Sequence, residues 1–416
     1  MFRKVLIANR GEIAVRIIRA CRELGIPTVA IYSQADANSL HVRLATEAYC
    51  IGPAKSADSY LSIPAIMSAA MVSGADAIHP GYGFMSERAD FAEICEKQGI
   101  KFIGPTAEAM RKMGDKATAR KTMIENDVPV TPGTGIVKTV EEVQDFANEV
   151  GYPIILKATA GGGGKGMRIC RSDEEVELNM ELCQSEAKNF FGNPDVYAEK
   201  YLENPRHIEV QILGDSFGNV VHLGERDCSI QRRHQKLLEE APSPAINEET
   251  RKQMGAAAVR AAKAINYEGA GTCEFLLDHD GEKISYTQND IHLKGHAIEC
   301  RINAENPRKG FMPNPGTISG YLAPGGFGVR VDSHVYQDYT IPPYYDSMIG
   351  KLICWGRTRN EARRRMYRAL KEYVVTGVET TIPFHQAIIE DEVFMSGKFN
   401  TGFIEDFYKR KGLSEE

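Results

Sequence analysis

The N-terminal part of the chain alternates between apolar runs and an amphipathic stretch. Residues 4–9 predict a buried parallel strand, and the apolar spacing over residues 11–24 predicts a helix. Residues expected on the buried side of this helix are Ile13, Ile17, Ala20, Cys21 and Leu24. A second strand, residues 28–32, follows Pro27. Because this βαβ order builds parallel sheets, the sequence predicts an α/β fold that opens with a doubly wound parallel sheet.

Two further short apolar runs, residues 77–79 and 101–103, extend the predicted sheet. The first leads into the loop Pro80-Gly-Tyr-Gly-Phe84, whose aromatic is placed as a ligand contact, or simply as a packing tyrosine in a tight turn. The turn after the first strand, Asn9-Arg-Gly-Glu12, lacks the G-x-G-x-x-G pattern. A dinucleotide site at that turn is therefore not expected.

The pattern changes character from about residue 113. A helix is predicted to begin at 114–116, and Pro129-Val-Thr-Pro132 marks the entry to a separate small unit. A strand is expected at 196–202, and alternating residues predict antiparallel strands at 207–213, 220–223 and 271–277. A third unit contains a helix over about 359–374, rich in Arg and Lys on one face.

A run of four glycines, Gly161 to Gly164, followed by Lys165 and Gly166, stands between two strand-like runs at 152–156 and 167–170. Glycine gives a core nothing to pack, but it lets backbone N–H groups approach phosphate oxygens closely. Lys157 and Lys165 bracket the loop with positive charge. A flexible linker is the alternative, and the flanking strands favour a phosphate-binding flap over it. The Walker spacing is absent, because no Gly-Lys-Ser/Thr opens a helix here.

Composition narrows the class of protein. Hydrophobic content of 43% and charged content of 25% are those of an ordinary soluble globular protein. The net charge of −6 argues against a nucleic-acid or membrane partner. No apolar run has the length of a bilayer span and no signal peptide is visible, so we predict a cytoplasmic protein. Nine scattered cysteines without a Cys-x-x-Cys pair indicate reduced core thiols rather than disulfides or zinc.

Residues 225–236 place seven charged or imidazole side chains in twelve positions. A solvated helix face is the usual explanation of such a run. The flanking strands predict instead a loop over a sheet. Basic groups gathered near a phosphate flap can hold a second anion.

Together with the flap, several longer motifs make the chain resemble the biotin carboxylases, ATP-grasp enzymes of the acetyl-CoA and pyruvate carboxylase systems. These motifs are Gly81-Tyr-Gly-Phe84, Met113-Gly-Asp-Lys116, Glu199-Lys-Tyr-Leu202 and Glu299-Cys-Arg-Ile-Asn-Ala-Glu305. The resemblance implies three domains: an N-terminal Rossmann-like domain (1–112), an ATP-grasp domain (113–294) with a small lid at about 131–203, and a C-terminal α+β domain (295–416). It implies ATP- and bicarbonate-dependent carboxylation of biotin through carboxyphosphate.

The resemblance also implies roles for individual residues. Those expected at ATP are Lys116, Lys157, Gly162, Gly163, Gly164, Gly166, Glu199, Lys200, Leu202, His207, Gln231, His234 and Leu276. Lys236 is expected to hold bicarbonate or carboxyphosphate, and Glu274 to bind Mg²⁺ or Mn²⁺. Arg301 is expected to stabilise the biotin enolate, with Tyr82 beside the ureido ring. Taken alone, Glu274 is equally explained as an edge-strand carboxylate, and Arg301 as a partner of Glu305.

Biotin is expected on a separate carrier. No Ala-Met-Lys-Met-like turn occurs, the nearest segment being Arg111-Lys-Met113 in a helical context, and we expect no swinging domain after the third unit. The implied partners are a biotin carboxyl carrier protein and carboxyltransferase subunits. Arg16, Glu23 and Phe327 match positions that the family uses at a homodimer interface, which predicts a homodimer.

One segment departs from the resemblance. Between Glu274 and Arg301 the chain is a few dozen residues shorter than the family, which continues into Glu-Met-Asn-x-Arg-x-Gln-Val-Glu-His and a long helix. In the family this segment carries the second pair of magnesium ligands, the bicarbonate-binding arginine and glutamine, and the general base. In the same register this chain has Tyr286 and Gln288 at the magnesium positions. Loss of the segment, placed after Ile284, is expected to uncover a sheet edge and apolar core.

Three interpretations of the shorter segment stay open. One is a deletion made in reading or assembling the gene. Another is a natural internal-deletion variant that binds ATP and partners but turns over poorly. The third is replacement of the lost groups by Asp290 or Glu282. A different ATP-grasp ligase is a weaker alternative, because Arg301 and Tyr82 are both present.

Overall fold

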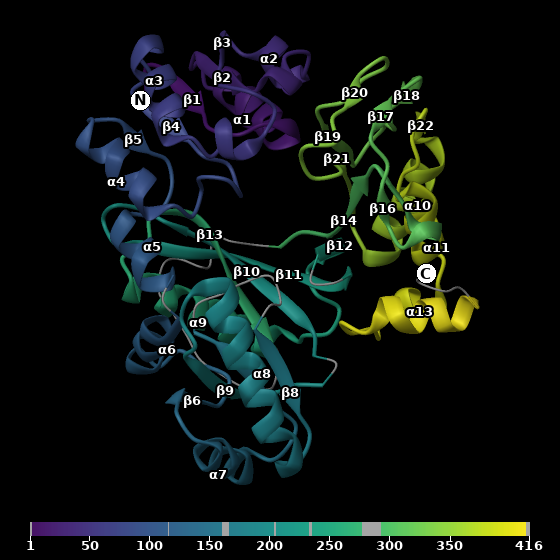
Figure 1. The fold of residues 1–416 in the computed structure, drawn as a ribbon. Coiled ribbons are helices and arrows are strands. Elements are labelled where there is room, and N and C mark those ends of the chain that lie inside the picture. Colours follow the sequence, from purple (N-terminus) through teal and green to yellow (C-terminus); the bar gives the residue numbers. More distant parts are fainter. Residues whose placement is uncertain are drawn as a thin grey trace.

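The computed structural model describes residues 2–114, 116–159, 166–203, 205–232, 235–276 and 293–412. Its N-terminal part is a five-stranded parallel sheet in the order β3-β2-β1-β4-β5, which confirms the predicted doubly wound opening (Figure 1). The strands are β1 (Val5–Ile7), β2 (Thr28–Tyr32), β3 (Glu47–Cys50), β4 (Ala77–His79) and β5 (Lys101–Phe102). The helices of this part are α1 (Gly11–Glu23), α2 (Leu40–Leu44), α3 (Ile63–Ser73) and α4 (Ala89–Lys97).

Helix α1 has the predicted extent but a different buried side. Ile17 and Cys21 are buried as predicted, whereas Ala20 is exposed and Leu24, which caps the helix, is 60% exposed. Glu12, Ala14 and Ile18 are buried instead. The reason is that α1 packs on its own sheet and also against strands β19 and β21 of a second sheet, so it buries a wider face than one apolar stripe.

A small four-stranded antiparallel sheet, ordered β6-β9-β7-β8, forms the unit that contains the glycine run. Its strands are β6 (Gly133–Val137), β7 (Ile154–Ala158), β8 (Met167–Cys170) and β9 (Val196–Lys200). Helices α7 (Val140–Val150) and α8 (Asp173–Phe191) cover it, and α5 (Ala107–Gly114) and α6 (Lys116–Glu125) lead into it. Strands β7 and β8 pair from Ile154↔Cys170 to Lys157↔Met167, so the two strands that flank the glycines form a hairpin as predicted. Residues 160–165 themselves lie outside the described residues.

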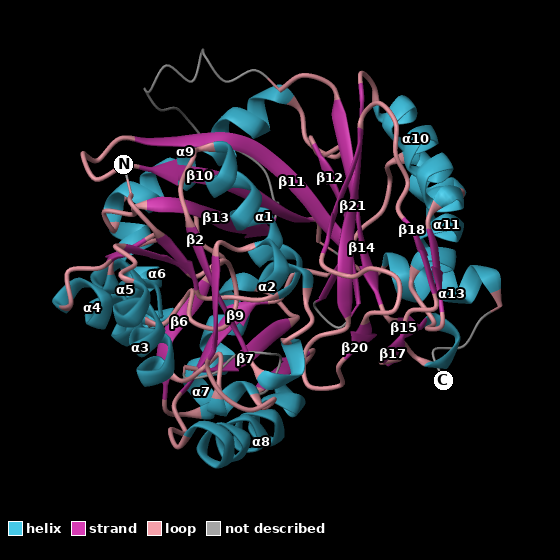
Figure 2. Ribbon diagram, turned by 90° about the horizontal axis from the view of Figure 1, so that it is seen from above, coloured by secondary structure: helices cyan, strands magenta, loops and turns pink. Residues whose placement is uncertain are grey.

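A seven-stranded sheet, ordered β13-β10-β11-β12-β14-β21-β19, runs through the middle of the molecule (Figure 2). Its strands are β10 (His207–Gly214), β11 (Val220–Arg232), β12 (Gln235–Ala241), β13 (Gly269–Leu276), β14 (His296–Asn303), β19 (Val329–Ser333) and β21 (Met348–Gly356). Helix α9 (Glu248–Ala264) packs on β10, β11 and β13. The interpretation of residues 225–236 as a loop was wrong, because β11 continues to Arg232 and β12 begins at Gln235. Charged side chains fit into these strands because they are paired: Arg226 donates to Glu209, and Arg206 donates to Asp227.

The C-terminal part packs helices and short strands on one end of this sheet. The helices are α10 (Arg359–Glu372), α11 (Ile382–Ile389), α12 (Glu392–Ser396) and α13 (Phe403–Lys411). The short strands are β15 (Glu305–Asn306), β16 (Met312–Pro313), β17 (Gly316–Thr317), β18 (Gly320–Leu322), β20 (Thr340–Ile341) and β22 (Val374–Thr376). Their apolar side chains join those of β14 and β21 in one large core cluster.

Within the described ranges, no helix combines the length and the apolar character that a bilayer span requires. All nine cysteines are free thiols.

Candidate active site

One face of the seven-stranded sheet carries a row of charged side chains. Strand register places Glu274 of β13 beside Glu209 of β10, and Glu209 beside Arg226 of β11. Further along, Glu239 of β12 is opposite Glu299 of β14. Because side chains of a strand alternate between faces, residues that are register partners lie on the same face of the sheet.

Lys236, predicted to hold an anion, lies at the start of β12 between two carboxylates. Its ammonium donates a hydrogen bond to Glu209 and another, 3.3 Å long, to Glu274. Burial acts to lower the pKa of Lys236, but Cys228 and the carboxylates of Glu209 and Glu274 raise it above its ordinary value. Lys236 is therefore a cation at neutral pH, held in place at the site.

Glu274, the predicted metal ligand, is half-exposed and shared between two partners. Its second oxygen lies 3.4 Å from Nε2 of His207. The hydrogen bond from His207 and the charge of Lys236 lower the pKa of Glu274 to about 2, against the effect of burial. A carboxylate that is ionised at neutral pH is the kind of ligand that Mg²⁺ takes, usually one or two at a time together with phosphate oxygens. The residue fits that role as a single ligand.

His207, predicted at ATP, has one ring nitrogen without a partner. Its Nδ1 is buried and has no hydrogen-bond partner among the described residues. A buried polar atom without a partner costs stability, so such an atom commonly marks a place where a ligand binds. The contact between His207 and a nucleotide stays a prediction.

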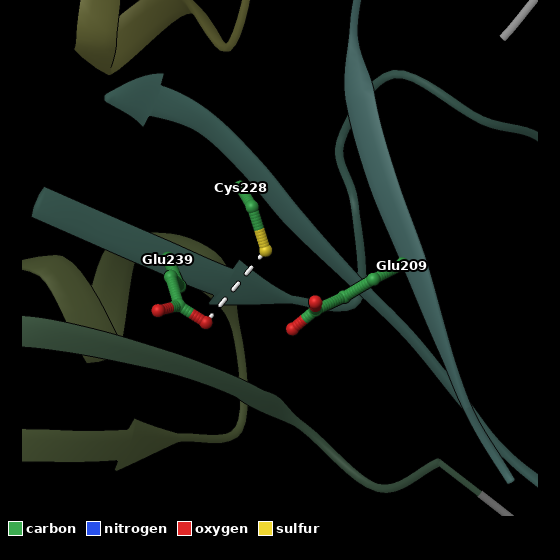
Figure 3. A group of neighbouring side chains, drawn as sticks. All are labelled: Glu209, Cys228 and Glu239. Atoms are coloured by element: carbon green, nitrogen blue, oxygen red, sulfur yellow. Dashed lines mark hydrogen bonds between the residues drawn. The ribbon is translucent and has the colours of Figure 1, made fainter. Parts of the chain in front are cut away.

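The middle of the row is a compact group of acids, cations and a thiol. Arg226 Nε donates to Glu209 at 2.6 Å, and Arg301 donates to Glu239 at 2.5 and 3.0 Å. Figure 3 shows the thiol of Cys228 directed at Glu239, 3.6 Å away, with Glu209 facing the same space from another strand. Burial raises the pKa of the Cys228 thiol, so it is protonated at neutral pH.

Glu209, Cys228 and Glu239 bring three possible ligand atoms within 4.8 Å of one another. They do not fit a metal centre, because their charges are already balanced. Burial acts to raise the pKa of Glu209, yet Arg226 and Lys236 lower it overall, and Glu239 holds Arg301. The group is a buried ion-pair network that fixes Lys236 and Arg301 in the row.

On the lid sheet, Lys157 of β7 donates a hydrogen bond to Glu199 of β9, two predicted ATP residues that the structure brings together. Lys200 follows Glu199, and its ammonium donates to the carbonyls of Gly151 (2.9 Å) and Tyr152 (3.1 Å). The Lys200 side chain is thus occupied by the backbone before β7. Leu202 follows the end of β9, and Gly166 precedes β8.

The structure describes the remaining predicted residues to different extents. Gln231 is the register partner of Lys236, so the two lie opposite each other on neighbouring strands. Lys116 begins α6 and Leu276 ends β13, and only their backbones are described. Gly162, Gly163, Gly164 and His234 lie outside the described residues, as do Glu282, Tyr286, Gln288 and Asp290.

Tyr82 lies between the N-terminal sheet and the charged row. Its hydroxyl donates a hydrogen bond to Glu12, and the ammonium of Lys351 stands 5.1 Å from its ring centroid. Lys351 is the register partner of Arg301 and pairs with Glu299 at 3.4 Å. A cavity of about 720 Å³ opens beside these groups, with Tyr82, Gln211, Arg226 and Thr272 in its wall.

Sequence reasoning missed five residues of this site: Glu209, Arg226, Glu239, Glu299 and Lys351. Only some of these residues have a sequence signal, which is alternation along a strand. In β14, for example, Ile298, Cys300 and Ile302 are buried, whereas Glu299 and Arg301 face the other side. Like charges at Glu239 and Glu299 oppose each other, which Arg301 offsets.

Comparison with known proteins agrees with this fold. Residues 115–288 match the family model "Carbamoyl-phosphate synthase L chain, ATP binding domain", which defines an ATP-grasp protein. Residues 1–110 match "Biotin carboxylase, N-terminal domain" and residues 299–406 match "Biotin carboxylase C-terminal domain". The chain belongs to the biotin carboxylase family.

The similarity extends over the whole chain. It is 56% identical to biotin carboxylase 1 of Bacillus subtilis over 445 residues, covering 98% of this chain and 99% of the relative. It is 51% identical to the biotin carboxylase of Haemophilus influenzae over 452 residues, covering 100% of both chains.

Two solved structures are similar to this chain over nearly its whole length. A biotin carboxylase–β,γ-ATP complex from Campylobacter jejuni is 46% identical, with a TM-score of 0.92 over 98% of this chain and 99% of the other. The biotin carboxylase domain dimer of Hydrogenobacter thermophilus 2-oxoglutarate carboxylase is 49% identical, with a TM-score of 0.89 over 98% of both chains. The latter was solved with MgADP, ADP and bicarbonate.

Proposed function

We propose that this chain is the biotin carboxylase of a biotin-dependent carboxylase, built for ATP- and bicarbonate-dependent carboxylation of biotin on a carrier protein. The system served is acetyl-CoA carboxylase in fatty-acid synthesis or a related acyl-CoA or pyruvate carboxylase. The observation that supports it most is the connected row Glu274–Lys236–Glu209–Arg226–Glu239–Arg301 on one sheet, because its two ends are the residues that we assign to the metal and to biotin.

The nucleotide end of the row holds the groups that ATP needs. We assign the phosphates to Lys116, Lys157 and the flap, and the adenine to Glu199, Lys200 and Leu202. His207, Gln231, His234 and Leu276 complete the nucleotide site, and Glu274 supplies one ligand to Mg²⁺. Support comes from the Lys157–Glu199 contact and from the unpartnered Nδ1 of His207 among the described residues. When bound, the metal balances phosphate charge during phosphoryl transfer to bicarbonate.

The other end of the row holds groups for small anions and for biotin. Lys236 offers a compact, fixed ammonium to bicarbonate or carboxyphosphate. Arg301 offers a guanidinium, fixed by Glu239, to the developing negative charge on the biotin ureido oxygen. Tyr82 is the aromatic that we assign to the same ring.

We further propose that a catalytic segment is missing from the chain after Ile284. The alignment with the Haemophilus protein spans 452 residues, 36 more than the 416 of this chain, although it covers both chains completely. The motif Glu-Met-Asn-x-Arg-x-Gln-Val-Glu-His does not occur in the sequence. Within the described residues, β13 stands at the end of the sheet, where a further strand would pair. We therefore infer ATP binding with little turnover, a catalytically impaired variant of the family.

The proposal includes three domains, at residues 1–112, 113–294 and 295–416, and a cytoplasmic location. The proposed partners are a biotin carboxyl carrier protein and carboxyltransferase subunits. We also propose a homodimer through Arg16, Glu23 and Phe327. Phe327 is 79% exposed, which suits an interface residue. A molar mass of a strict monomer by light scattering at micromolar concentration would count against the dimer.

Calorimetry with MgATP tests the nucleotide end. The unmodified chain is expected to bind, and Lys157→Ala is expected to bind about tenfold or more weakly, as the loss of one charge-assisted hydrogen bond implies. Lys236→Ala is expected to retain MgATP and to lose the effect of bicarbonate. Lys188→Ala, an exposed lysine of the lid helix α8, is the matched control and is expected to behave as the unmodified chain. Absence of MgATP binding by the folded, unmodified chain would refute the proposal.

A further inference from the structure

The turn after β1 buries three polar side chains that the proposed function does not use. Asn9, Arg10 and Glu12 are 3%, 6% and 5% exposed. The sequence Asn9-Arg-Gly-Glu12 lacks a phosphate-binding glycine pattern. Burying polar groups is costly unless each has a partner, so the partners indicate what the turn is for.

Two of these side chains, those of Asn9 and Glu12, form hydrogen bonds with the loop at residues 80–84. The Asn9 amide donates to the carbonyls of Pro80 (2.6 Å) and Tyr82 (2.8 Å). Glu12 accepts a hydrogen bond from the Tyr82 hydroxyl. Tyr82 is thus fixed at its backbone and at the tip of its ring, although 44% of the residue is exposed.

The loop is built for this close approach. Gly81 has φ +65°, and a Cβ there would lie 2.8 Å from the Asn9 amide nitrogen. Glycine is the residue that accepts both the left-handed backbone and the contact. Arg10 turns the other way, to Asp36 at 2.6 and 2.8 Å, and ties the turn to the rest of the N-terminal sheet.

The far side of the Tyr82 ring faces the charged row. Lys351 stands 5.1 Å from the ring centroid, pairs with Glu299, and is the register partner of Arg301. The ring therefore has a carboxylate at its hydroxyl and an ammonium near its face. Tyr82 also lines the cavity of about 720 Å³.

We propose that Glu12 is a positioning residue, which together with Asn9 holds the Tyr82 ring in the orientation that receives biotin. This inference rests on the proposed function for the identity of the ligand, and on the contacts of this structure for the anchoring of Tyr82. The first βα turn of the N-terminal sheet thereby serves the site on the second sheet, without touching the ligand itself.

The charge of Glu12 gives the anchoring a measurable signature. Burial raises the pKa of Glu12 to about 7, Lys351 opposes the rise, and Asp332, Glu299 and Asp346 add to it. Above this pH Glu12 is a carboxylate, and below it a neutral acid, which accepts a weaker hydrogen bond from Tyr82. The environment of the Tyr82 hydroxyl is therefore expected to change as the pH passes through about 7.

Solution NMR of the full chain labelled with ¹³Cζ-tyrosine tests the inference, with the Tyr82 signal assigned from Tyr82→Phe. In the unmodified chain the Tyr82 signal is expected to shift with a midpoint near the Glu12 pKa of about 7. In Glu12→Gln, which keeps the size and an acceptor but cannot titrate, it is expected to stay constant. Glu96→Gln, an exposed residue of α4, is the matched control and is expected to titrate as the unmodified chain does. A constant Tyr82 signal in the unmodified chain, or unchanged titration in Glu12→Gln, would overturn the inference.

Free biotin, added to the same proteins and to Glu12→Ala, separates the inference from the proposed function. Biotin is expected to perturb the Tyr82 signal, with an affinity about tenfold lower in Glu12→Ala, the equivalent of one hydrogen bond. Tyr82→Phe removes the hydroxyl that donates this hydrogen bond to Glu12, and it is expected to lower biotin affinity by a similar factor. Competition binding or calorimetry measures this affinity. Equal biotin affinity in all variants would overturn the positioning role and leave the function intact. A Tyr82 signal that follows Glu12 but ignores biotin would instead contradict the proposed function.

Discussion

The strands of the two main sheets are buried in different ways. In the N-terminal sheet, Val5 and Ile7 of β1 join one apolar cluster and Leu6 and Ala8 the other, so both faces are apolar. In the seven-stranded sheet, β14 buries Ile298, Cys300 and Ile302 on one face and carries Glu299 and Arg301 on the other. The first sheet can offer chemistry only at its strand ends, as at Asn9 and Tyr82, whereas the second offers it along a whole face.

The largest effect is expected where the charged face is most crowded. Arg301→Met leaves Glu239, 6% exposed, without its main partner and opposite Glu299. Breaking a buried pair in this way is expected to lower the free energy of unfolding by about 3 kcal/mol. Urea unfolding measures it, and the double variant Arg301→Met/Glu239→Gln is expected to regain most of the loss. A loss below about 1 kcal/mol in the single variant would show that the face is solvated rather than buried.

Acid pH is expected to lower the free energy of unfolding through His385, which contacts the backbone of the strand that carries Arg301. His385 of α11 is fully buried, with its Nε2 2.8 Å from the carbonyl oxygen of Arg301, and burial lowers its pKa to about 4. The ring is neutral in the fold and takes up a proton on unfolding, so its contribution to stability is present at pH 7. This contribution is lost as pH falls from about 6.5 to about 4, at no more than about 1.4 kcal/mol per pH unit.

His385→Gln keeps a donor for the Arg301 carbonyl and cannot titrate. Urea unfolding at pH 7, 6 and 5 is expected to show a smaller loss of stability toward acid pH in this variant than in the unmodified chain. Parallel pH profiles for the two proteins would contradict the assignment of a neutral, buried ring.

The smallest effect is expected from a change that is confined to the buried, apolar side of β14. Ile298→Val removes one methyl group from a site with no exposure, and is expected to cost about 1 kcal/mol of unfolding free energy. Because this face packs on the C-terminal helices and not on the ligand, MgATP affinity by calorimetry is expected to stay unchanged. A tenfold change in affinity would mean that the two faces are not independent.

The difference between the sheets also explains what can be predicted from the sequence. The pattern of apolar residues locates β2, β4 and β8 to the residue and β7 to within two residues. The charged run at 225–236 resembles a loop, because a dense run of charged residues is unusual in a strand that is buried over most of its length. The buried Glu12 has no sequence signal, since its partner Tyr82 is 70 residues away and its burial depends on strands of another sheet.

Recognition of the site depends on motifs more than on pattern. Resemblance alone identifies Lys236, Glu274 and Arg301, and the structure places them in one connected row. Their supporting partners Glu209 and Glu239 escape notice, because Glu209 looks like the solvent-facing residue of an alternating strand, and Glu239 stands in a stretch of β12 that does not alternate. Only strand register shows that these carboxylates and cations share one face.

We infer that the chain retains the ATP and biotin elements of a biotin carboxylase without the segment that carries the general base. A coupled ATPase assay, with and without bicarbonate and biotin, tests it on the unmodified chain and on one in which the family's Glu-Met-Asn-x-Arg-x-Gln-Val-Glu-His strand and following helix are inserted after Ile284. The repaired chain is expected to exceed the unmodified one by about 100-fold or more, the contribution of a general base alone. Biotin-dependent turnover of the unmodified chain within about tenfold of the repaired one, well short of that contribution, would contradict the claim, and would direct attention to Glu282, Gln288 and Asp290 as replacements.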